Sequence, residues 1–158
     1  TYKGLSSVIM ALNSRHATVY CIDPLDGRGD TASSGYEQVD LRPIVRANHV
    51  RYGVRNCAVI ATTSREARAG WKRRIDLLFV DGSHDYADVS FDVNEWGVLV
   101  KPGAHMIMDD ATPISSKPGV IRAAREALAS PRWLKVEEAG ACLVLRRQRD
   151  DQQGGSSR

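Results

Sequence analysis

The stretch that decides the fold is IDLLFVDGSHDY, residues 75–86. Its first half, Ile75–Val80, is a short apolar run, and its second half begins at Asp81 and contains His84. An apolar run of this length that ends in polar and glycine residues predicts a strand buried in a parallel sheet. The polar half would then follow directly on the carboxyl end of that strand.

A second apolar run, residues 105–108, leads in the same way into Asp109 and Asp110. In open α/β sheets, ligands bind beyond the carboxyl ends of the strands. We therefore expect three carboxylates, with that of Asp81, and the imidazole of His84 to meet at one edge of the sheet. Three carboxylate oxygens in a small space suit a hard divalent cation. The alternative is that one of the two adjacent aspartates faces solvent.

Helical and strand patterns alternate along the rest of the chain. Helices are predicted over residues 5–13, 40–52, 64–69, 86–99 and 118–129, and strands over residues 18–22, 57–61, 75–80, 106–108, 134–139 and 141–147. This alternation predicts an α/β fold with a Rossmann-like, doubly wound and mostly parallel sheet. The last two strands form a hairpin around Gly140, which adds an antiparallel strand.

Local signals indicate where several elements begin and end. Asp40 and Ser64 are predicted helix caps, because a short polar side chain there can accept a backbone N–H. Residues 101–103, Lys-Pro-Gly, are predicted to form a turn before the strand at 106–108. Residues 25–37 are rich in Gly, Asp and Ser and are predicted to form a loop.

At 158 residues the chain is expected to form one domain, over residues 1–147, followed by a disordered polar tail, 148–158. Its first residues look like a glycine-containing loop that enters a helix, and no strand precedes them. A Rossmann-like sheet needs a strand to deliver that loop, so we expect the first strand to be missing from the chain as given. Direct pairing of residues 18–22 with 75–80 would contradict this expectation.

Composition narrows the class of protein. The net charge is only +3 and the basic residues are scattered, which argues against nucleic acid as a partner. No apolar run reaches the roughly 18 residues that span a membrane, and no signal peptide is visible. Cys21, Cys57 and Cys142 lack metal-ligand spacing and lie in apolar runs, so we expect buried free thiols in a reducing cytoplasm.

Taken in order, the motifs resemble those of the class I S-adenosylmethionine-dependent methyltransferases. More narrowly, they are similar to the small metal-dependent O-methyltransferases that include the catechol and antibiotic-sugar enzymes. The resemblance covers roughly residues 1–147, and it rests on TYKGLSS (1–7), VYCID (19–23), DGSHDY (81–86), LVKPG (99–103) and MDD (108–110).

The resemblance implies a site for S-adenosylmethionine in the first part of the chain. The methionine carboxylate would lie at the helix start next to Tyr2, with Gly4 allowing close approach and Ser6 donating. Asp23, at the end of a strand, would accept the ribose hydroxyls, and Ser64 would lie near the adenine. The plainer alternatives are an ordinary helix start, a turn-forming aspartate and a simple helix cap.

The resemblance also implies roles for the residues around 81–110. Asp81, Asp109 and Asp110 would bind Mg²⁺ and leave room for two substrate oxygens and a water. His84 occupies the position of the general base, and Asp81 is both the alternative base and a cofactor contact. Alternatively, His84 only hydrogen-bonds the cofactor or caps the next helix.

The sequence thus predicts a Mg²⁺-dependent O-methyltransferase that acts on a hydroxyl of a diol-bearing small molecule. A sugar or polyketide-type natural product ranks first among the substrates and a catechol second, and a homo-oligomer is left open. The rival from another class is a non-catalytic Rossmann-like module that binds a nucleotide or a partner protein. A second rival is a related enzyme of hydroxylase type. Titration with S-adenosylmethionine, with and without Mg²⁺, separates the methyltransferase from the binding module.

Overall fold

The computed structural model describes residues 3–27 and 39–149. The chain forms two compact units, the first ending at Trp71 and the second beginning at Lys72. Tyr2, most of the predicted loop at 25–37 and nearly all of the predicted tail lie outside the described residues.

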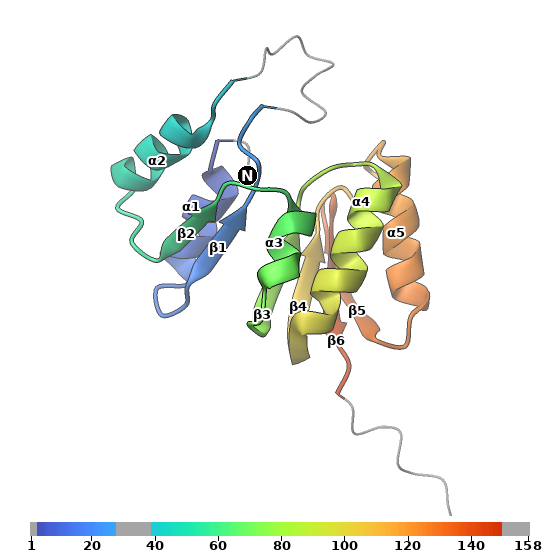
Figure 1. The fold of residues 1–158 in the computed structure, drawn as a ribbon. Coiled ribbons are helices and arrows are strands. Elements are labelled where there is room, and N and C mark those ends of the chain that lie inside the picture. Colours follow the sequence, from blue (N-terminus) through green and yellow to red (C-terminus); the bar gives the residue numbers. More distant parts are fainter. Residues whose placement is uncertain (1–2, 28–38, 150–158) are drawn as a thin grey trace, which may run out of the picture. The chain divides into compact units, whose positions relative to one another are not determined.

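Over residues 3–27 and 39–71, the first unit contains two parallel strands and three helices. In chain order the elements are α1 (Leu5–Asn13), β1 (Val19–Ile22), α2 (Arg42–Arg51), β2 (Cys57–Ile60) and α3 (Ser64–Gly70). β1 and β2 pair in register from Val19 opposite Cys57 to Ile22 opposite Ile60 (Figure 1). The order and type of these elements confirm the alternation that the sequence predicts.

The first unit buries few apolar side chains, and polar contacts supplement its packing. Among its described residues, one cluster of buried apolar side chains is found, consisting of Leu25, Leu41 and Val45. The side chain of Asn56 closes the end of α1, because its Nδ2 lies 2.9–3.2 Å from the carbonyl oxygens of residues 11, 14 and 17. A helix end leaves such carbonyl groups without intrahelical donors, so one amide side chain stabilises the whole turn.

The second unit is a four-stranded sheet with helices packed on it. Its elements are β3 (Ile75–Val80), α4 (Tyr86–Phe91), η2 (Asp92–Trp96), η3 (Gly97–Leu99), β4 (Val100–Met108), α5 (Pro118–Ala129), β5 (Trp133–Ala139) and β6 (Cys142–Arg147). The strand order is β3-β4-β6-β5. β3 and β4 are parallel, and β6 runs antiparallel to both of its neighbours. The C-terminal hairpin therefore adds one antiparallel strand, as predicted.

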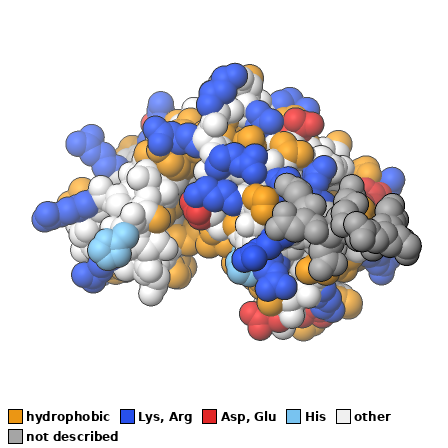
Figure 2. All heavy atoms as spheres, turned by 90° about the horizontal axis from the view of Figure 1, so that it is seen from below, with side chains coloured by type: hydrophobic (Ala, Val, Ile, Leu, Met, Phe, Trp, Pro, Cys, Tyr) orange, Lys and Arg blue, Asp and Glu red, His pale blue; other side chains and the backbone are white. Residues whose placement is uncertain are grey.

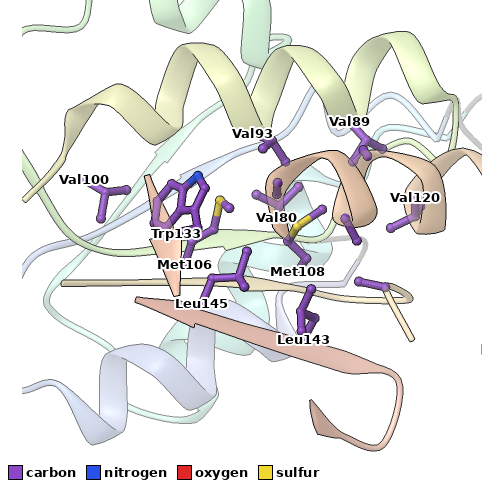
Figure 3. Packing of buried hydrophobic residues seen from close by; sticks show 14 residues of the cluster. Val80, Val89, Val93, Val100, Met106, Met108, Val120, Trp133, Leu143 and Leu145 are labelled. Atoms are coloured by element: carbon purple, nitrogen blue, oxygen red, sulfur yellow. The ribbon is translucent and has the colours of Figure 1, made fainter. Parts of the chain in front are cut away.

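A single apolar core holds the second unit together. Fourteen buried residues form it, and Figure 3 shows their side chains between the sheet and the helices α4 and α5. Met106, Met108, Leu143 and Leu145 project from β4 and β6 and are almost completely buried. Burial of apolar side chains is the dominant favourable term in the free energy of folding. The sheet edge that carries Asp81 and Asp109 is thus built on a well-packed support.

Three local expectations are wrong, and the first two concern the region from α4 to β4. Residues 101–103 are part of β4, where Ile75 pairs with Val100 but Leu77 pairs with His105, so the Lys-Pro-Gly segment is a bulge and not a turn. The helix predicted to continue from α4 changes to a π-helical turn at Asp92 and a 3₁₀ turn at Gly97.

The third wrong expectation concerns helix caps. α3 is capped by Thr63, which forms a reciprocal capping box with Glu66, so Ser64 is the first helical residue and not the cap. α2 has Leu41 as its N-cap residue, while Asp40 accepts from the N–H of Arg42 one residue further out.

The two sheets are separate. In the described part of the chain β1 pairs with β2 alone, and β3 pairs with β4 alone. The direct pairing of residues 18–22 with 75–80, which would have contradicted an intervening strand, does not occur. The strand itself stays a prediction.

The surface carries mixed charges. On the face in Figure 2, Lys and Arg side chains are scattered among hydrophobic and neutral ones, with a few Asp and Glu side chains. Among the described helices, none combines the length and the apolar character that crossing a membrane requires.

Candidate functional site

The carboxyl ends of β3 and β4 bring the predicted acidic residues to one edge of the second unit. Val80 pairs with Met108, and the N–H of Asp109 donates to the carbonyl of Val80 at 3.0 Å. Asp81 and Asp109 therefore leave their strands side by side, and Asp110 follows immediately. The strand ends thus place the backbones of the three predicted acidic residues at this edge.

His84 lies against Asp110. Its Nε2 is 3.2 Å from Oδ2 of Asp110, and both side chains are about one quarter to one third exposed. Asp110 reaches this position with a φ of 53°, a left-handed conformation that aspartate tolerates better than most residues. Because an ionised carboxylate only accepts hydrogen bonds, Nε2 carries a proton in this pair, and Nδ1 is the basic nitrogen of neutral His84. Nδ1 is shielded from solvent.

Cys142, the first residue of β6, also belongs to this edge. Its Sγ donates to Oδ1 of Asp109 at 3.1 Å. Burial, the hydrogen bond to Asp109 and the charges of Asp109, Asp81 and Asp110 raise the pKa of this thiol to about 11. The thiol is therefore a neutral donor that orients Asp109. The sequence indicated a free thiol here but had no signal for this contact, because the hairpin brings Cys142 back from a distant part of the chain.

The loop between Asp81 and α4 is held in place by α5. A Cβ on Gly119 would lie 2.3 Å from the carbonyl oxygen of His84 and 2.7 Å from the nitrogen of Tyr86, so only glycine fits there. Tyr86 donates to Glu126 at 2.7 Å, and the guanidinium of Arg122 lies 3.8 Å from the centre of its ring. These contacts position the backbone that carries His84.

A small cavity of about 10 Å³ opens beside this loop. Its size is near the lower limit for a single water molecule. It is lined by Val80, Asp81, Gly82, Ser83, His84, Val89, Asp109 and Val120. The predicted base and two of the predicted acidic ligands therefore share one cavity wall.

The expected cation geometry is not formed. Across residues 3–27 and 39–149, no group of three or more His, Cys, Asp or Glu side chains is arranged to hold a metal ion. The reason is visible in the contacts, since Asp110 faces His84 and Asp109 accepts from Cys142. In this arrangement the three carboxylates do not fit a bound Mg²⁺, and their role as ligands stays a prediction.

In the first unit, the predicted cofactor loop leads into α1 through Gly4. Gly4 is the N-cap residue with a φ of 82°, and its carbonyl accepts from the N–H of Val8 at 3.0 Å. Ser6 is half-buried in the first turn of α1. Its neighbour Ser7 is buried and contacts Gly4 directly. Sequence reasoning missed Ser7, because a helical serine gives no pattern that distinguishes it from Ser6.

Asp23 lies at the end of β1, as predicted, and forms a local turn. Its Oδ1 accepts from the N–H of Leu25 at 2.7 Å, which is the turn-forming alternative. Ser64 lies at the start of α3, next to its cap Thr63. The roles of Asp23 toward a ribose and of Ser64 toward an adenine stay predictions.

The chain is similar to a known protein family in sequence and to solved structures in fold. A family model described as a methyltransferase domain matches residues 1–111. No curated protein sequence matches the chain.

Several solved structures share the fold. The O-methyltransferase NovP is 17% identical with a TM-score of 0.73, and the match covers 94% of this chain and 69% of NovP. TomG from Streptomyces achromogenes, an O-methyltransferase solved with S-adenosylmethionine, is 13% identical with a TM-score of 0.64, covering 94% and 70%. The O-methyltransferase of Bacillus cereus, solved with S-adenosylhomocysteine, is 13% identical with a TM-score of 0.58, covering 91% and 80%.

The family model spans well over half of the chain, and the structural matches reproduce its α/β fold. The edge that carries Asp81, His84, Asp109 and Asp110 thus lies in a Rossmann-like fold of known type. The chain belongs to the methyltransferase-domain family, with the fold of the class I methyltransferases.

Proposed function

We propose that the chain is an S-adenosylmethionine-dependent O-methyltransferase that acts on a hydroxyl of a diol-bearing small molecule. The observation that carries this proposal is the contact between His84 and Asp110 at the carboxyl edge of β3 and β4. An imidazole next to a carboxylate can accept a proton, because the carboxylate stabilises the imidazolium that forms. Removal of a hydroxyl proton is the step that turns a weak oxygen nucleophile into a strong one.

The cofactor assignment rests on the family and on the loop that enters α1. TomG and the Bacillus cereus enzyme were solved with S-adenosylmethionine and S-adenosylhomocysteine, respectively. The free N–H groups at the start of a helix attract an anion, here the methionine carboxylate, while Ser6 donates and Asp23 accepts from the ribose. Ser64 would lie near the adenine, and Tyr2 would complete the loop.

In the proposed reaction, the substrate hydroxyl gives its proton to His84 and its oxygen attacks the sulfonium methyl group in line. An oxygen–carbon bond forms, the carbon–sulfur bond breaks, and S-adenosylhomocysteine leaves. Because Nδ1 of His84 is shielded, the loop of residues 82–85 has to shift before this nitrogen accepts a proton. Asp81, on the wall of the same cavity, is the alternative base.

The proposal also includes assistance of the reaction by Mg²⁺. Asp81, Asp109 and Asp110 would hold the ion, which would lower the pKa of a chelated hydroxyl. The contacts of Asp109 with Cys142 and of Asp110 with His84 would have to open first, so no step above depends on the ion. If the ion takes part, EDTA should lower turnover and added Mg²⁺ should restore it. Turnover that EDTA leaves unchanged would remove the ion from the proposal and leave the steps above intact.

The proposed substrate class rests on the resemblance of the sequence motifs, and the relatives are consistent with it. TomG is described as acting in tomaymycin synthesis, and NovP is also an O-methyltransferase. We therefore place a sugar or polyketide-type natural product first and a catechol second. Cys21, Cys57 and Cys142 form no disulfide, and on this ground we place the protein in a reducing cytoplasm.

A direct test incubates the chain with S-adenosylmethionine and a panel of sugar diols, polyketide diols and catechols, and follows products by mass spectrometry. Methylation of a hydroxyl in at least one compound is the expected result. Titration calorimetry with S-adenosylmethionine runs in parallel. Binding without any methylation across the panel would favour the non-catalytic module, and absence of both would contradict the proposal.

A further inference from the structure

A chain of hydrogen bonds connects α2 to the loop that enters α1. The hydroxyl of Ser7 lies 2.9 Å from the carbonyl oxygen of Gly4 and 2.9 Å from Nε2 of His49. Ser7 is 1% exposed and His49 is 9% exposed. Buried polar side chains destabilise a fold unless their hydrogen bonds are satisfied. The contact between Ser7 and His49 therefore holds the start of α1 in a defined position against α2.

The direction of these bonds can be assigned. A carbonyl oxygen only accepts, so the single proton of the Ser7 hydroxyl points to Gly4. His49 must therefore donate from Nε2 to the hydroxyl oxygen. Burial lowers the pKa of His49, which favours the neutral ring. The contact with Ser7 then places the proton of that ring on Nε2. The bonds run from His49 through Ser7 to Gly4.

Two more contacts from α2 reach the same loop. Nδ2 of Asn48 donates to the carbonyl of Lys3 at 2.8 Å. A Cβ on Gly4 would lie 3.2 Å from Cγ1 of Val45, so the backbone of Gly4 packs closely against α2. Side chains from two successive turns of α2 thus contact Lys3, Gly4 and Ser7.

We propose that Asn48 and His49 are positioning residues for the methionine end of S-adenosylmethionine. This inference rests on the proposed function. Asn48 holds the carbonyl group of Lys3, and His49 holds the hydroxyl of Ser7, which contacts the carbonyl of Gly4. These contacts fix the first turn of α1, so that the backbone N–H groups of residues 5–7 would be in place for the carboxylate. Neither residue contacts the cofactor, and both act through the loop. Ordering a flexible loop on binding costs conformational entropy and lowers the affinity. A loop that is already held in its binding conformation avoids this cost.

The test compares cofactor affinity with turnover in three variants of the chain. His49→Ala and Asn48→Ala should each weaken S-adenosylmethionine binding by about 3- to 10-fold, the size expected for one lost hydrogen bond. His49→Gln keeps an N–H donor near the position of Nε2, so its affinity should stay close to that of the unmodified chain. Turnover at saturating cofactor should change little in all three, because the groups that handle the proton lie in the second unit.

Two control variants remove residues of the same type elsewhere. His16→Ala removes an exposed histidine, and Asn94→Ala removes an exposed asparagine that bonds only within its own helical segment. Both should leave the affinity unchanged. Melting temperatures measured for every variant separate local from global effects.

The outcomes are distinguishable. If the unmodified chain binds S-adenosylmethionine while His49→Ala and Asn48→Ala bind it equally well, the inference is wrong and the proposed function stands. If His49→Gln loses as much affinity as His49→Ala, the hydrogen-bond role is wrong. Absence of binding by the unmodified chain would overturn both the inference and the proposed function.

Discussion

The two units of this chain hold their candidate residues by different means. In the second unit, fourteen buried apolar residues support the edge that carries His84 and the aspartates. In the first unit, the described apolar cluster has three members, and the loop before α1 is held by side chains of α2. The proposed proton acceptor therefore rests on a packed core, and the proposed cofactor loop rests on hydrogen bonds.

Because of this difference, we expect substitutions in the two units to affect different properties, namely the stability of the fold and the affinity for the cofactor. The core of the second unit is large enough to tolerate the loss of one surface contact. The two-stranded sheet of the first unit has a small core, so its stability depends on the helices packed with it and on bound ligands. Substitutions in the second unit should therefore act on turnover or on global stability. Substitutions around the loop of the first unit should act on cofactor affinity.

The largest expected effect is on turnover. His84→Ala should lower kcat by about 10²–10⁴-fold, the usual contribution of a general base, with little change in the dissociation constant of S-adenosylmethionine. Steady-state kinetics and calorimetry on the same preparation measure both quantities. An unchanged kcat would assign the proton to Asp81, and Asp81→Asn would then show the loss.

Next comes the core of the second unit. Leu145 is fully buried, and Leu145→Ala should lower the free energy of unfolding by about 2–5 kcal/mol, through lost burial and the cavity left behind. Leu77 is 46% exposed on the same sheet, and Leu77→Ala is the matched control. Urea unfolding measures both, and equal losses would show that the apolar core does not hold this unit.

Gly119 tests whether α5 positions His84. An added methyl group would overlap the backbone of His84 and Tyr86, so Gly119→Ala should displace the loop and lower kcat by about 10²-fold, as expected for a misplacement near 1 Å. Gly70→Ala is the control, since a Cβ at Gly70 meets nothing within 4 Å. If Gly119→Ala is folded and keeps its turnover, the close packing of α5 does not position His84.

The smallest effect is a dependence of stability on high pH. The pKa values of Cys57 and Cys142 are raised to about 11 from 9.0, mainly by burial. Above pH 9 the unfolded chain loses these protons while the folded chain keeps them. Their contribution to stability is therefore complete below about pH 9 and is lost as the pH rises toward 11.

Urea unfolding between pH 8 and 10.5 measures this loss. Cys142→Ser keeps a hydroxyl donor for Asp109 but does not ionise in this range, so its stability should fall less steeply with pH. An identical pH dependence in the variant would show that Cys142 does not contribute.

Much of this structure could be predicted from sequence where local patterns are strong. α1, β3 and α5 have the predicted bounds, because the pattern of apolar residues is strong there. The lengthening of β4 through residues 101–103 could not be predicted, because a bulge depends on the neighbouring strand rather than on local propensity.

The candidate site shows the same limit. Strand ends place Asp81, Asp109 and Asp110 at one edge, which follows from the order of elements alone. Contacts between distant segments, such as Cys142 with Asp109 and His49 with Ser7, leave no periodic signal in one sequence. These contacts decide which oxygen or nitrogen atoms are engaged, and they explain why the expected cation geometry is not formed.

The most direct test of this account is hydrogen exchange of the chain with and without S-adenosylmethionine. The account predicts that the cofactor slows exchange at residues 5–7 and at the end of β1, whereas β4 and β6 exchange slowly in both states. Protection confined to the second unit, with residues 5–7 unaffected, would contradict the assignment of the cofactor loop to the first unit.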